Sequence, residues 1–138
     1  MTNTLNVNRN SIIVLRVLLS GIFIVASFNH LFNLEKTVHK INQARFKDLA
    51  YLFGDPSITV IASGIPMLFA GVALMAGYKT KYAALILAFI ITPITITVQV
   101  GQMATIGPLF KNIAIFGGLL FFIMNNFNNL KTKQNEIN

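Results

Sequence analysis

Charged residues are spread unevenly along the chain, and the intervals between them are long and apolar. Four intervals contain no Asp, Glu, Lys or Arg, namely residues 17–34, 56–78, 82–110 and 112–130. An α-helix rises about 1.5 Å per residue, so a helix of about 20 apolar residues crosses the hydrocarbon core of a bilayer. Because each interval contains at least 18 residues, the pattern predicts four transmembrane helices.

Local signals refine the limits of these helices. Asn10 or Ser11 can cap the first, and Ser57 can cap the second after the helix-breaking run Gly54-Asp55-Pro56. We expect spans at about residues 12–34, 57–78, 82–103 and 109–127. They form one domain, residues 12–130, between an N-terminal tail (1–11) and a polar C-terminal tail (131–138). The fold class is therefore an all-α membrane protein with a bundle of four transmembrane helices.

The third predicted span contains a local pattern that competes with a helix. Residues 94–100 alternate β-branched and polar side chains, as a strand would in a water-soluble protein. An unpaired strand cannot satisfy its backbone hydrogen bonds in lipid, so a helix is favoured. We expect this helix to be kinked at Pro93, with nearby threonine hydroxyls compensating for the lost hydrogen bond.

The segment between the first two spans has a different character. Residues 35–55 hold seven of the fifteen charged residues, and their apolar positions recur at roughly helical spacing. This pattern predicts an amphipathic helix that lies on the membrane surface.

Composition agrees with a membrane protein and excludes several functions. Only 11% of the residues are charged, compared with about 25% in soluble domains. The net charge of +7 does not indicate nucleic-acid binding, because the Lys and Arg residues flank apolar spans, where anionic lipid head groups attract them. The chain has no cysteine, which excludes disulfides, thiol redox chemistry and cysteine-ligated clusters.

The short turn between the second and third spans bears on orientation. Lys79 and Lys81 lie in it between Tyr78 and Tyr82, and short cationic loops favour the cytoplasmic side. We therefore expect both termini in the cytoplasm.

Six polar residues at or near the spans are candidates for the interior of the bundle or for binding: Arg16, Asn29, His30, Gln99, Lys111 and Asn112. His30 could relay a proton or bond a quinone carbonyl, or it could simply bond a neighbouring residue near the lipid–water boundary. Asn29 and Gln99 could instead make interhelical hydrogen bonds. No metal site is expected, because the second histidine, His39, is not at a ligand spacing from His30. No catalytic constellation is evident.

Lys111 is the one charged residue between positions 82 and 130. It falls near the start of the predicted fourth helix, where the helix dipole disfavours a cation. An anionic partner, either a lipid phosphate or Asp55, would offset this, and a solvated position at the turn is the alternative.

Four blocks of sequence resemble the DoxX family of small bacterial membrane proteins. They are Leu15–Phe23, Phe28–Phe32, Gly77–Lys81 and Phe110–Gly118, the last of which contains the aromatic-Lys-Asn sequence at Lys111 and Asn112. The resemblance implies a four-helix bundle in the bacterial inner membrane, with both termini inside, and an association with membrane oxidoreductases. Members often have a histidine in the third helix, where this chain has Gln99. The family has no agreed catalytic residues to transfer.

Two functions are consistent with these observations. The first is a non-catalytic membrane subunit that supports an oxidoreductase, with no intrinsic cofactor and with quinone as the candidate ligand. The second is a lipid-binding or small-molecule-binding protein, or a transporter, in which Arg16 and Lys111 hold anionic groups. The expected partners are the lipid bilayer and an oxidoreductase, and the sequence leaves oligomerisation open.

Overall fold

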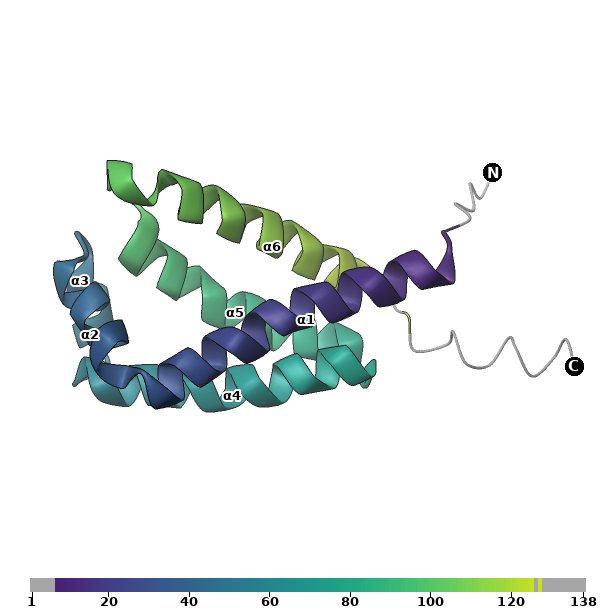
Figure 1. Cartoon of the computed structure of the whole chain (residues 1–138), viewed down its shortest axis with the longest axis horizontal. Helices are drawn as coiled ribbons and strands as arrows, with labels where there is room; N and C mark the ends of the chain where they lie inside the picture. The colour runs from purple at the N-terminus through teal and green to yellow at the C-terminus, as the bar shows by residue number, and fades with distance from the viewer. Residues whose placement is uncertain (1–6, 126, 128–138) are drawn as a thin grey trace, which may run out of the picture.

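The computed structural model describes residues 7–125 and residue 127. Over these residues the chain is helical, without strands, in agreement with the predicted all-α class (Figure 1). The elements are α1 (Arg9–Phe32), α2 (Leu34–Gln43), α3 (Lys47–Tyr51), α4 (Pro56–Ala76), α5 (Thr80–Gln99), the 3-10 helix η1 (Met103–Thr105) and α6 (Ile106–Met124). The predicted polar tail at 131–138 lies outside the described residues.

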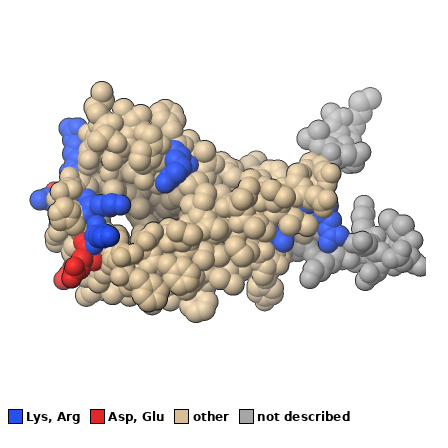
Figure 2. Space-filling view, viewed as in Figure 1, with Lys and Arg blue, Asp and Glu red and all other residues tan. Residues whose placement is uncertain are grey.

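Four helices are long and apolar enough to cross a membrane. These are α1, α4, α5 and the segment Met103–Met124 that comprises η1 and α6, with mean hydropathies between 1.8 and 2.3. Large apolar side chains such as Phe69 (71% exposed) and Phe89 (81% exposed) point away from the bundle. Figure 2 shows that Lys and Arg on the viewed face gather mainly toward the two ends of the molecule. This surface suits a helical bundle surrounded by lipid.

The four long helices pack in an open arrangement. α1 lies along α4, and α4, α5 and α6 follow as successive antiparallel neighbours (Figure 1). α6 meets α1 where Gly118 lies against Leu19, and it diverges from α1 toward the end that carries α2 and α3 (Figure 1). The main core fills the space between the helices, with fully buried Leu74, Leu87, Leu119 and Phe122 at its centre.

Two glycines permit the close packing of α1 and α4. A Cβ atom at Gly64 would lie 3.0 Å from the Cβ of His30, and one at Gly71 would lie 3.1 Å from Cγ1 of Ile24. Their seven-residue spacing places both glycines on the same face of α4. A larger side chain at either position would push the two helices apart.

The segment between α1 and α4 forms two short helices in place of the single predicted helix. α2 ends at Gln43, and α3 begins at Lys47 after an extended residue, Ala44. Ile41, Ala50 and Val60 form a small second core that joins these helices to α4. This segment therefore packs on the bundle, while its predicted location at a membrane surface stays a prediction.

Several helix ends differ from those expected. Asn8, rather than Asn10 or Ser11, caps α1, with its side-chain oxygen 2.9 Å from the Asn10 nitrogen. Asp55 caps α4 in place of Ser57, by accepting a hydrogen bond of 2.8 Å from the Ser57 nitrogen. α6 begins at Ile106, before the expected Leu109, and includes Pro108 in its first turn.

Helix α5 continues through Pro93. Two threonines beside the proline donate hydroxyl hydrogen bonds of 2.7 Å to backbone carbonyls of the preceding turn, Thr92 to Ala88 and Thr95 to Ile91. Such bonds give nearby carbonyls partners within the helix, where the proline nitrogen cannot donate.

Candidate functional site

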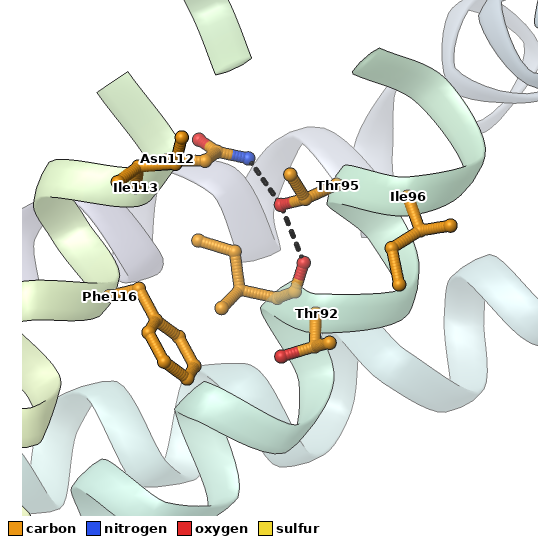
Figure 3. Close-up of a pocket in the computed structure, with 7 residues that line it drawn as sticks. Thr92, Thr95, Ile96, Asn112, Ile113 and Phe116 are labelled. Atoms are coloured by element: carbon orange, nitrogen blue, oxygen red, sulfur yellow. Dashed lines mark hydrogen bonds between the residues drawn. The ribbon is translucent and has the colours of Figure 1, made fainter. Parts of the chain in front are cut away.

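A hydrogen-bonded polar pair joins α5 to α6 within their apolar interface (Figure 3). Asn112 is 8% exposed, and its amide nitrogen donates to the Thr95 hydroxyl over 2.8 Å. Thr95 passes its own hydrogen to the Ile91 carbonyl. The two hydrogen bonds therefore run in one direction, from Asn112 to Thr95 and from Thr95 to the Ile91 carbonyl.

The pair lies beside a groove of about 200 Å³ between the two helices. The groove is lined by Ile91, Thr92, Thr95, Ile96, Asn112, Ile113 and Phe116, and Figure 3 shows its labelled residues coming from both helices. We call it the α5–α6 groove. Thr92, Ile96 and Ile113 are exposed, so the groove opens on the outer surface of the bundle, where a bilayer would supply lipid-soluble ligands.

Asn112 retains hydrogen-bonding capacity after contacting Thr95. A carboxamide has two N–H donors and one oxygen acceptor. Only one N–H is used, and the oxygen accepts no hydrogen bond from the residues that the structure describes. Asn112 can therefore donate to, or accept from, a small polar group in the groove.

The His30 side chain contacts a residue of the neighbouring helix α4. Its Nδ1 lies 3.3 Å from the Ser63 hydroxyl, which donates to the Val60 carbonyl over 2.9 Å. With the hydroxyl hydrogen directed to Val60, the contact with Ser63 requires the His30 tautomer that carries a proton on Nδ1. This contact matches the structural alternative considered for His30.

The remaining predicted residues do not converge on this groove. Asn29 and Lys111 are exposed, and Asn29 accepts a hydrogen bond of 3.1 Å from Asn33. They therefore do not line the interior as expected. Gln99 and Arg16 are half-buried, at opposite ends of the bundle, and each has a buried polar atom without a partner.

Lys111 also differs from its expected position along the helix. It is the sixth residue of α6, more than one turn beyond the helix start. It makes no ion pair with Asp55 within the described part of the chain, where the Asp55 side chain caps α4. Of the two anionic partners considered, only a lipid phosphate stays a prediction.

The threonines of the groove were not recognised as site residues from the sequence. The sequence predicts only that threonines near Pro93 compensate for its missing N–H, and Thr92 and Thr95 both donate to carbonyls of the preceding turn. Thr95 and Asn112 are 17 positions apart, and no local spacing rule connects them. Among the described residues, no group of three or more His, Cys, Asp or Glu side chains could hold a metal ion.

Comparison with known proteins identifies the family. The DoxX family model matches residues 11–100, about two thirds of the chain, which covers α1 to α5. The Lys111–Asn112 sequence lies beyond the matched segment, so its value as a family feature stays a prediction. No curated protein and no solved structure matches the chain. With four apolar helices and this match, the chain is a multi-pass membrane protein that belongs to the DoxX family.

Proposed function

We propose that this protein is a non-catalytic membrane subunit of a quinone-linked oxidoreductase in the bacterial inner membrane, and that the α5–α6 groove holds the quinone head group. The observation that carries the proposal is a buried carboxamide with unused hydrogen-bonding groups beside an apolar groove that opens toward lipid. A quinone has two carbonyl acceptors on an apolar ring and an apolar tail. The second N–H of Asn112 suits one carbonyl, and Ile91, Ile113 and Phe116 suit the ring.

The size of the groove limits what it can take. Sites that enclose a drug-sized ligand have volumes of about 300–1,000 Å³. A groove of about 200 Å³ therefore accommodates a single ring and leaves a long tail in the surrounding lipid. In this arrangement the subunit positions quinone, while redox groups on a partner protein carry out electron transfer.

Affinity purification of the full chain in mild detergent tests the subunit role. We expect recovery of a partner that carries a flavin, haem or iron–sulfur cluster, together with quinone. Recovery of the chain without any redox-active partner from membranes of its own source would contradict this role.

A lipid-binding function is the second candidate, and the apolar lining of the groove favours it. An acyl chain could occupy the groove without using Asn112. Replacement of Asn112 by Leu separates the two functions, because it should lower the content of bound quinone but leave a bound acyl chain in place.

A further inference from the structure

The guanidinium of Arg16 occupies an unusual position at the other end of the bundle. It lies against Gly77, the residue with φ of 77° that ends α4. A Cβ atom at Gly77 would be 2.8 Å from Cζ of Arg16 and 3.1 Å from Nη2. A Cβ atom at this position would therefore displace the guanidinium, which is the flexible end of the Arg16 side chain.

The contact with Gly77 indicates where the guanidinium lies along the length of the bundle. Arg16 is the eighth residue of α1, about 10 Å along the helix from its start. Its side chain nevertheless reaches the residue at which α4 ends. Exposed Tyr78 and Tyr82 flank the same turn, and Nζ of Lys79 lies 5.6 Å from the Tyr78 ring centroid. Aromatic and cationic residues of this kind mark the depth of lipid head groups.

Arg16 has no hydrogen-bonding or ionic partner among the residues that the structure describes. Its Nε is buried without a hydrogen bond, and no described residue pairs with the guanidinium. A guanidinium has five N–H donors in a planar fork that matches phosphate. Leaving a half-buried cation without an acceptor is unfavourable, so the arrangement calls for an anion from outside the chain.

The start of α5 supplies a second, independent feature. Thr80, its first residue, is 2% exposed, and its hydroxyl has no hydrogen-bonding partner in the described part of the chain. No side chain caps this helix at Lys79. Unsatisfied N–H groups at a helix start favour an anion.

The charge distribution favours the same ligand. Arg16, Lys79 and Lys81 lie at this end of the bundle, whereas the acidic residues within the described ranges, Glu35, Asp48 and Asp55, lie in the segment at the opposite end. Figure 2 shows Lys and Arg without Asp or Glu at this end of the viewed face.

We propose that Arg16, seated on Gly77 beside the start of α5, binds the phosphate of an anionic lipid. The guanidinium contacts the phosphate, and the helix start and exposed lysines contribute attraction. Gly77 acts as a positioning residue, because its missing side chain leaves room for the guanidinium. This site is separate from the α5–α6 groove and does not depend on the function proposed for the groove.

Lipid titration of the delipidated full-length protein tests this site, with native mass spectrometry as the readout. Phosphatidylglycerol should be retained in preference to phosphatidylcholine. Arg16→Gln should lower that preference about tenfold, because charge-assisted hydrogen bonds are lost, and Arg16→Lys should restore part of it. Lys81→Gln, which removes an exposed charge at the same end, should change the preference less than twofold. Equal effects of Arg16→Gln and Lys81→Gln would overturn the proposal.

The glycine offers a second test. Gly77→Ala should reduce lipid retention, whereas Gly54→Ala should not. Gly54 also has a positive φ, of 102°, but a Cβ there would meet nothing within 4 Å. The control thus carries backbone strain without displacing a guanidinium, and equal retention by the two variants would contradict the role of Gly77.

Two further measurements complete the experiment. Inorganic phosphate at millimolar concentration should not displace phosphatidylglycerol, and full displacement would overturn the assignment to a lipid. Quinone content should be the same in Arg16→Gln as in the unaltered protein, because Arg16 does not line the α5–α6 groove. The lipid site and the quinone site are therefore tested separately, and either proposal can fail without the other.

Discussion

Asn112 and Lys111 are neighbours in the sequence but lie in different surroundings. Consecutive residues of an α-helix point about 100° apart, so one side chain can be buried in an interface while the next faces outward. Asn112 is buried against Thr95, and Lys111 is exposed. The charge pattern makes Lys111 conspicuous in the sequence. The direction of each side chain depends on how α6 packs on α5, which the sequence alone does not reveal.

The hydrogen bond between Asn112 and Thr95 should stabilise the protein modestly. Interhelical hydrogen bonds in membranes contribute about 0.6 kcal/mol on average. Thr95→Val and Asn112→Leu should each lower stability, and the double variant should lose less than the sum by about that amount. Thermal or denaturant unfolding in detergent measures this coupling. Strict additivity would show that the contact contributes nothing.

The sequence identified the long elements well but placed their ends less well. Four charge-free intervals define the four apolar helices because lipid exposure requires long uncharged runs. α6 begins at Ile106, before the predicted start at residue 109, and Pro108 lies within its first turn. Proline is tolerated in the first turn of a helix, where its missing N–H would have no partner. Asn8, Asn10 and Ser11 are all suitable caps by residue type, and only the structure selects Asn8.

The contact between α1 and α4 depends on their glycine contacts, and a substitution can test it. Gly64→Leu should destabilise the protein by about 1–3 kcal/mol, because the added side chain meets His30 and Leu31. Gly117 is the matched control, since a Cβ atom there would meet nothing within 4 Å. Gly117→Leu should be neutral or slightly stabilising through higher helix propensity. If both variants unfold alike in detergent, close packing at Gly64 is not a determinant of stability.

The whole molecule has two chemically different ends. One contains the start of α1, the turn between α4 and α5, and the cations Arg16, Lys79 and Lys81. The other contains α2 and α3 and all three described acidic residues (Figure 1). The short cationic turn with Lys79 and Lys81 predicts that the first end faces the cytoplasm.

Cysteine labelling can test this orientation, since the natural chain has no cysteine to interfere. In intact cells, a membrane-impermeant maleimide should label Asp48→Cys at once and Lys81→Cys only after permeabilisation. Both positions are exposed, so access to the reagent should depend on the side of the membrane. The reverse labelling pattern would invert the orientation.

The most direct test of the groove as a quinone site is the quinone content of purified variants. Asn112→Leu removes the carboxamide beside the groove, and Asn29→Leu makes the same chemical change at an exposed position on α1. Quinone should be extracted and quantified per mole of protein after purification in mild detergent. We expect about a fivefold loss for Asn112→Leu, as for one lost hydrogen bond of about 1 kcal/mol, and no change for Asn29→Leu. Absence of quinone from the unaltered protein, or equal quinone content in both variants, would contradict a quinone site between α5 and α6.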